Sequence, residues 1–232
     1  MLYLAYQKKE THNEKKFLEI IANTGIILLA FGLYSLLQML YLLSDDVKSG
    51  AYWGEVILIV LLTVALIAVM WAVYRAQLKR ANPQGFDQKP HFKWRRIFVT
   101  LLGIVMMLVI QMIFVSSFGG QQPENQAELN QLATNQNTLF KVLIAFVAPV
   151  IEEIIFRGYL VNTFFKANTV LSKIAAIIVG GLVFGLLHEP RLSAYLLIYW
   201  GMGIVLMSVY IFTKDLRYGM AVHIFNNALS VI

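Results

Sequence analysis

The chain has 232 residues, of which 59% are hydrophobic and 14% charged, and its mean hydropathy is +0.67. This composition excludes an ordinary soluble globular domain, and a sequence without cysteine excludes disulfides, a thiolate nucleophile and cysteine-ligated metals. The net charge of +6 comes largely from lysines and arginines that flank apolar runs, which indicates membrane topology and not nucleic-acid binding.

Apolar runs of about 20 residues match the hydrocarbon core of a bilayer, and they recur along this chain. The predicted spans are, in chain order, Phe17 to Leu43, Tyr52 to Tyr74, Ile97 to Phe118, Thr138 to Phe165, Val170 to His188, Leu192 to Phe212 and Leu216 to Ile232. The expected fold class is therefore all-α, a polytopic transmembrane helix bundle with about seven spans. We expect a single membrane domain over residues 1–232, with N-terminal spans and a polar outer loop in 1–137 and motif-bearing helices in 138–232.

The short loops predict the orientation, because lysine and arginine accumulate on the cytoplasmic side. The N-terminal tail before Phe17 carries four lysines, and the segment from Arg75 to Arg96 is strongly basic. The segment from Gly119 to Asn137 carries two glutamates and neither lysine nor arginine. We therefore expect a multi-pass protein of the cell membrane, of bacterial type, with a cytoplasmic N-terminus and an outer C-terminus. His91, within the basic segment, is interpreted as a solvated residue.

Ionisable groups inside the membrane are concentrated in the fourth predicted span, in the sequence VIEEIIFRGYL. Each costs on the order of 2.5 to 3.5 kcal/mol on insertion, so each predicts a partner or a function. Glu153 and Arg157 are four residues apart and can pair on one helix face. Glu152 points elsewhere and needs another partner, which makes it the catalytic candidate. Pro149 should bend the helix and free carbonyl groups nearby.

Two later spans carry histidines. The fifth ends with Phe184 and His188 on one face, beside a Gly181 and Gly185 pair spaced for close helix contact. The seventh carries His223 and Asn227, again four residues apart. Counted along straight helices, Glu152 falls at mid-membrane, His188 near the outer end and His223 nearer the inner end. Convergence of these groups therefore requires tilted helices, kinked helices or span boundaries that differ from the predicted ones.

If these side chains converge, hydrolysis is the chemistry available to them. A carboxylate with a neutral imidazole can hold and deprotonate water, and a second imidazole with an amide can stabilise the resulting oxyanion. The alternative is a zinc ion held by Glu152, His188 and His223. A third interpretation is that they act only as interhelical hydrogen-bonding groups. No cofactor is assigned at this stage.

Other classes are less compatible with the sequence. His188-Glu189-Pro190 lacks the second histidine of HExxH, and proline would break the helix that this motif needs. A G-x-S-x-G nucleophile elbow is missing, and aspartates are missing from the predicted spans, which argues against serine and aspartyl proteases. A transporter would use Glu and His as proton relays, but the sequence shows neither an inverted repeat nor a second charged half.

In order along the chain, Glu152-Glu153-x-x-x-Arg157, Phe184-x-x-x-His188 and His223-x-x-x-Asn227 resemble the three motifs of the CPBP (Abi) family of intramembrane peptidases, which includes the type II CAAX prenyl endopeptidases. The resemblance covers Val150 to Asn227.

The resemblance implies an all-α membrane endopeptidase, of glutamate or metallo type, acting on a peptide or lipid-linked protein substrate in the bilayer. Glu152 and His188 would activate water, His223 and Asn227 would form the oxyanion site, and the supporting residues would be Glu153, Arg157 and Phe184. The alternative within the family is a non-catalytic protein, either a bacteriocin self-immunity factor or a membrane scaffold. A final helix of some relatives is expected to be missing, because the sequence stops five residues after Asn227.

Overall fold

The structure is a computed structural model that describes residues 2–43, 52–118 and 138–231. Every regular element in those ranges is helical, which confirms the all-α class. The first half forms three long helices, α1 (Leu2–Leu43), α2 (Tyr52–Arg80) and α3 (Trp94–Phe118). The predicted outer loop, residues 119–137, lies outside the described residues, as does most of the loop between the first two spans.

The second half is built from helices that contain π-helical stretches. The fourth span runs through α5 (Thr138–Val142), η1 (Leu143–Val147), α6 (Ala148–Glu153), η2 (Ile154–Tyr159) and α7 (Leu160–Phe164). The fifth runs through α8 (Val170–Ala175), η3 (Ala176–Gly180) and α9 (Gly181–His188), and the last two are α10 (Ala194–Thr213) and α11 (Leu216–Val231). A π-helix bonds each residue to the fifth one before it, so its turn is wider than an α-turn, and such stretches often mark functional sites.

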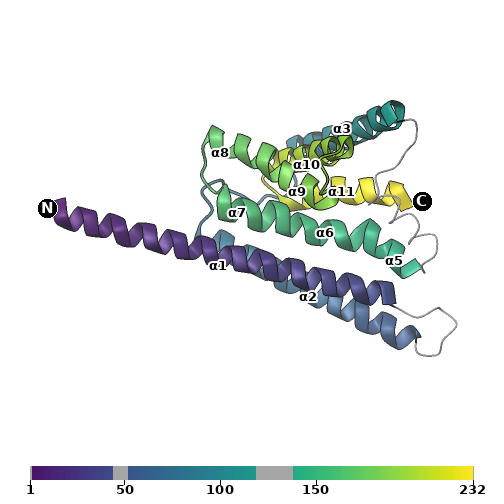
Figure 1. The fold of residues 1–232 in the computed structure, drawn as a ribbon, viewed down its shortest axis with the longest axis horizontal. Coiled ribbons are helices and arrows are strands. Elements are labelled where there is room, and N and C mark those ends of the chain that lie inside the picture. Colours follow the sequence, from purple (N-terminus) through teal and green to yellow (C-terminus); the bar gives the residue numbers. More distant parts are fainter. Residues whose placement is uncertain (1, 44–51, 119–137, 232) are drawn as a thin grey trace.

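Five helical stretches of the described residues are long and apolar enough to cross a membrane: Asn13–Leu43, Trp53–Arg80, Trp94–Phe114, Val170–His188 and Ala194–Thr213. The fourth predicted span fails this test because it carries charged residues, and α11 fails because it has only 16 residues. Both nevertheless lie alongside the five, consistent with about seven crossings (Figure 1). Large apolar side chains such as Leu28, Leu61 and Val105 remain exposed, as lipid-facing surfaces require.

The helix ends differ from the predicted span ends. Helix α1 begins at Leu2, well before Phe17, and α2 continues to Arg80, beyond Tyr74. Lysine, glutamate, glutamine and arginine favour helix, so the helices continue past the apolar runs that identified them. Helix α10 begins at Ala194, because the Ser193 hydroxyl accepts a hydrogen bond from the Tyr195 N–H at 3.2 Å.

Figure 1 shows how the bundle is divided. Helices α1 and α2 lie side by side along one side of the fourth span, and α3 with α8 to α11 lies along the other. The two chain ends lie at opposite ends of the bundle, as an odd number of crossings requires. The fourth span is therefore enclosed from both sides, which explains how its charged residues can avoid lipid.

Close contact between α9 and α10 sets the position of the fifth span. A Cβ added to Gly203 would lie 2.5 Å from the Gly181 carbonyl oxygen, and one added to Gly185 would lie 2.9 Å from the Trp200 nitrogen. The two backbones approach so closely that larger residues would not fit. The predicted role of the Gly181 and Gly185 pair in helix contact is confirmed.

Candidate active site

The fourth span places its charged residues between two π-helical stretches. Glu152 and Glu153 end α6, directly after η1 and before η2. Glu153 and Arg157 are completely buried, and Arg157 Nη1 lies 3.0 Å from Glu153 Oε1. The ion pair predicted from their spacing is confirmed.

Pro149 frees one carbonyl, as the sequence predicted. In the π-helical register of η1, the Ala148 N–H bonds to the Leu143 oxygen, five residues back. The next bond in this register would run from residue 149 to the Ile144 oxygen, but proline has no N–H to donate. The Ile144 oxygen instead accepts a hydrogen bond from Asn227 Nδ2 at 3.1 Å. The proline thereby creates an attachment point for α11.

His223 on α11 is held by the second glutamate. Its Nδ1 lies 3.1 Å from Glu153 Oε1, in a region where both side chains are buried. A carboxylate that bonds one imidazole nitrogen sets the orientation of the ring. The other nitrogen, Nε2, lies 3.8 Å from Glu152 Oε2. Glu153 therefore links Arg157 of its own helix to His223 of another.

The Glu152 carboxylate has two different environments. Its Oε1 accepts a hydrogen bond from the Tyr34 hydroxyl of α1 at 3.0 Å. Its Oε2 is buried without a hydrogen-bond partner among the described residues. That same oxygen lies 3.6 Å from His188 Nε2 and 3.8 Å from His223 Nε2. Glu152 thus has the partners that its position on the helix required, and they come from three other helices.

The apparent difference in depth between these residues disappears in the structure. His188 and His223 lie within 3.6 and 3.8 Å of one carboxylate oxygen, although they were expected near opposite ends of the membrane.

Three contacts fix the His188 ring. Its Nδ1 lies 2.9 Å from the Phe184 carbonyl oxygen. Because a carbonyl oxygen only accepts, we assign the proton to Nδ1, which leaves Nε2 with a lone pair directed at Glu152. The ring also contacts Phe184 at 4.1 Å and stacks on Tyr199 at 5.3 Å between centroids.

Phe184 packs against aromatic and charged members of the cluster. Its ring lies edge-to-face with Phe156 at 5.2 Å and with His223 at 5.8 Å. The Arg157 guanidinium lies 4.6 Å from its centroid, a cation–π contact in a buried region. Phe184 therefore touches both the ion pair and the two histidines.

The structure brings together most of the residues selected from the sequence, namely Glu152, Glu153, Arg157, Phe184, His188 and His223. Asn227 is bound one helical turn beyond His223. Its Nδ2 donates to the Ile144 oxygen, and its Oδ1 accepts from Asn226 Nδ2 at 3.3 Å.

Sequence reasoning did not find Tyr34 or Tyr199. Both lie in apolar spans that contain other aromatic residues, and no spacing pattern distinguishes them. Their selection would require knowing which face of α1 and of α10 meets the fourth and fifth spans.

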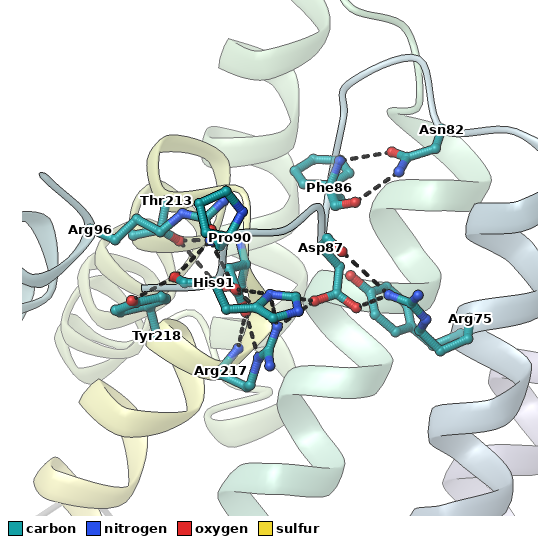
Figure 2. Close-up of polar contacts among 12 residues, drawn as sticks. Arg75, Asn82, Phe86, Asp87, Pro90, His91, Arg96, Thr213, Arg217 and Tyr218 are labelled. Carbon is teal, nitrogen blue, oxygen red and sulfur yellow. Dashed lines mark hydrogen bonds and ion pairs between the residues drawn. The ribbon is translucent and has the colours of Figure 1, made fainter. Parts of the chain in front are cut away.

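A second polar cluster joins the segment after α2 to the connection between α10 and α11 (Figure 2). Asp87 lies between Arg75 on one side and His91 with Arg217 on the other, and its N–H donates to the Lys214 oxygen at 2.7 Å. The solvated interpretation of His91 is wrong: its side chain is only 32% exposed, and its Nδ1 lies 3.1 Å from Asp215 Oδ2. The buried carboxylates of Asp87 and Asp215 thus hold the basic segment that contains His91 against the protein.

Asp87, His91 and Asp215 have ligand atoms within 4.8 Å of one another, a grouping that a cation could use. The same carboxylates already pair with arginines. Asp215 Oδ2 lies 3.0 Å from Arg96 Nη1, and Asp215 Oδ1 lies 2.9 Å from Arg217 Nε. Arg75, Arg96 and Arg217 thus balance the charge of the two aspartates. The cluster is therefore a set of structural ion pairs and a poor site for a cation.

Glu152, His188 and His223 have the side-chain types of a divalent metal site, but their ligand atoms do not all lie within 4.8 Å of one another, as those of Asp87, His91 and Asp215 do. Two imidazoles and one carboxylate are a common ligand set of catalytic zinc. Each histidine also holds its Nδ1 against a carboxylate or carbonyl oxygen, as metal-binding histidines do. The Glu152 Oε2, buried without a hydrogen-bond partner among the described residues, would be the carboxylate ligand of such a metal.

Comparison with known proteins supports an enzyme family. Residues 134–229 match the family model described as type II CAAX prenyl endopeptidase Rce1-like. The chain is similar to the membrane-embedded CAAX protease MroQ of Staphylococcus aureus (strain USA300), at 27% identity over 192 residues, 79% of this chain and 76% of the relative. No solved structure matches the chain. Residues 134–229 of this multi-pass membrane protein, which carry the Glu152, His188 and His223 cluster, are therefore similar to the Rce1-like CAAX protease family.

Proposed function

We propose that the protein is an intramembrane endopeptidase that hydrolyses a peptide bond of a small membrane-associated peptide or a lipid-linked protein. The observation that carries this proposal is the buried Glu152 Oε2, which has no hydrogen-bond partner among the described residues and faces the Nε2 atoms of His188 and His223. A group that binds there must offer hydrogens or positive charge, and water is such a donor.

Glu152 and His188 are the proposed water-activating pair. With its proton on Nδ1, His188 accepts one water hydrogen at Nε2 while Glu152 Oε2 accepts the other. Glu152 takes a proton as the water oxygen forms a bond to the carbonyl carbon, and the carbonyl oxygen becomes an oxyanion. The carbon–nitrogen bond then breaks, and the leaving nitrogen receives the proton from Glu152. The products are a carboxylic acid and an amine.

His223 and Asn227 are the proposed oxyanion groups. The two nitrogens of His223 each face a carboxylate, Glu153 and Glu152, and an imidazolium would make this buried set neutral: two glutamates against Arg157 and His223. A protonated Nε2 is a donor for the developing oxyanion. The Asn227 amide carries two hydrogens and gives one to the Ile144 oxygen, which leaves the second for the oxyanion.

Glu153 and Arg157 support this geometry without touching the water. Glu153 holds His223 at Nδ1, and Arg157 balances the charge of Glu153 from the same helix. Both are inaccessible to solvent. A divalent metal, if bound, would be held by Glu152, His188 and His223 and would supply Lewis-acid polarisation of the water.

The test is cleavage of a labelled precursor-peptide library by the purified protein in detergent. We expect Glu152→Gln and His188→Ala to lower the rate by on the order of 10²- to 10⁴-fold, because each removes a proton acceptor for water. Glu19→Gln is the matched control, since Glu19 is a partly exposed glutamate that pairs with Lys166 at 3.0 Å, away from this site. Each variant is assayed with and without a chelator.

The outcomes distinguish a hydrolase from a non-catalytic protein. Loss in both site variants with an unaffected Glu19→Gln supports the hydrolase, and chelator sensitivity of the wild type assigns a metal to the site. Full activity in Glu152→Gln would contradict the assignment of the general base. A protein that cleaves nothing in the library, yet whose cellular function survives Glu152→Gln, would be a non-catalytic immunity factor or scaffold.

A further inference from the structure

The first span contributes a side chain to the candidate active site. Tyr34 lies on α1, outside the residues 134–229 that match the protease family. It is only 6% exposed, and its hydroxyl donates to Glu152 Oε1 at 3.0 Å. Among the described residues, this hydroxyl is the hydrogen-bond donor to the Glu152 carboxylate.

The contact decides which way the carboxylate faces. The terminal torsion of glutamate is broad, so the backbone alone does not orient its two oxygens. With Oε1 bound to Tyr34, the other oxygen, Oε2, is directed at the Nε2 atoms of His188 and His223. Rotation of the carboxylate would carry Oε2 away from both.

Aromatic packing one turn before Tyr34 holds α1 against the fourth span. Phe31, one turn earlier on α1, lies edge-to-face with Phe156 of η2 at 5.5 Å. Residues three apart share a helix face, so Phe31 and Tyr34 meet the fourth span together. The packing of Phe31 therefore holds the face of α1 that carries Tyr34 against the fourth span, where the Tyr34 hydroxyl reaches Glu152.

We infer that Tyr34 is a positioning residue of the active site, whose hydroxyl holds Glu152 Oε1 so that Oε2 faces the water-binding position. The inference rests on the proposed function and extends the site to a helix outside the family match. Tyr34 does not contact the reacting atoms. Its effect on the reaction passes through Glu152.

The test compares Tyr34→Phe with Tyr41→Phe in the full-length protein, using the labelled peptide. Tyr41 is a matched control because it lies on the same helix, is 2% exposed and bonds Thr63 Oγ1 at 3.0 Å. We expect Tyr34→Phe to lower kcat by about 10- to 100-fold with KM unchanged within about twofold, since misplacing a catalytic group slows the chemical step. Tyr41→Phe should leave both constants near their wild-type values.

Thermal unfolding of both variants separates positioning from structural support. Equal melting temperatures with a kcat loss only in Tyr34→Phe support the inference. A wild-type kcat in Tyr34→Phe, a change confined to KM, or an equal kcat loss in Tyr41→Phe would overturn it. An inactive wild type contradicts the proposed function and with it this inference, whereas an active wild type with an unaffected Tyr34→Phe contradicts this inference alone.

Discussion

Two buried clusters of this protein contain the same kinds of groups and differ in how completely they are paired. The cluster at the end of the bundle joins Asp87 and Asp215 to three arginines and a histidine, and every carboxylate oxygen has a partner. The cluster inside the membrane joins Glu152 and Glu153 to one arginine and two histidines. There, one oxygen of each glutamate lacks a hydrogen-bond partner among the described residues.

This difference in pairing indicates that the aspartate cluster supports the fold and that the glutamate cluster can bind a ligand or water. A buried polar atom without a partner costs about 1 to 3 kcal/mol, so an arrangement that keeps one serves another purpose or is paired by a bound group. The fully paired aspartates hold the segment after α2 against the link between α10 and α11. Substitutions in the aspartate cluster should therefore lower stability, and substitutions in the glutamate cluster should lower activity.

The largest effect on stability is expected from Asp215→Asn. Asp215 is completely buried, and its loss of charge leaves the buried Arg96 without its carboxylate. We expect a loss of roughly 3 to 5 kcal/mol in unfolding free energy, because breaking a buried pair leaves an uncompensated charge. Denaturant titration in detergent, followed by circular dichroism, measures this loss.

Glu152→Gln is the counterpart within the membrane cluster. Its Oε2 has no hydrogen-bond donor among the described residues to lose, so the unfolding free energy of the variant should stay within about 1 kcal/mol of wild type, while cleavage falls on the order of 10²- to 10⁴-fold. If Glu152→Gln were as destabilising as Asp215→Asn, the two clusters would be alike and the comparison would fail.

An intermediate effect is expected at Gly219, which packs on the membrane cluster. A Cβ on Gly219 would lie 2.6 Å from Glu153 Oε2, and the other oxygen of the same carboxylate, Oε1, contacts Arg157 and His223. Gly219→Ala should cost about 1 to 3 kcal/mol in unfolding free energy and lower cleavage, because the displaced Glu153 no longer orients His223. Melting temperature and initial rate are the measurements. Gly25→Ala is the control, since a Cβ there has open space, and it should match or exceed wild-type stability.

The smallest effect concerns Lys214, next to the aspartate cluster. Burial, with a smaller contribution from Lys173, lowers the pKa of Lys214 to about 8. The unfolded chain therefore binds more protons between about pH 8 and about pH 10.4, so this group makes stability rise with pH across that window. At pH 8, an amine-reactive ester should label Lys214 on the order of tenfold faster than the exposed Lys79, as measured by peptide mass spectrometry. Equal rates would show that Lys214 is not desolvated.

The sequence was most informative where a local rule applied. The spacing of Glu153 and Arg157 predicted their ion pair, and Pro149 predicted a freed carbonyl, because both depend on one helix. The two histidine motifs indicated a common site, and the structure brings His188 and His223 to one oxygen. The π-helical stretches of the fourth and fifth spans were not predicted, and counting along straight helices placed His188 and His223 at different depths although they meet.

Composition and periodicity alone determined that this is a polytopic all-α membrane protein, because the bilayer demands long apolar helices whatever their arrangement. They also determined which buried ionisable groups needed partners. Only the tertiary structure decided that the partner of Glu152 is Tyr34, and that His91, expected in solvent, pairs with Asp215. Such pairs join residues more than a hundred positions apart, or a segment to a distant helix link, and no periodicity records which helix faces meet.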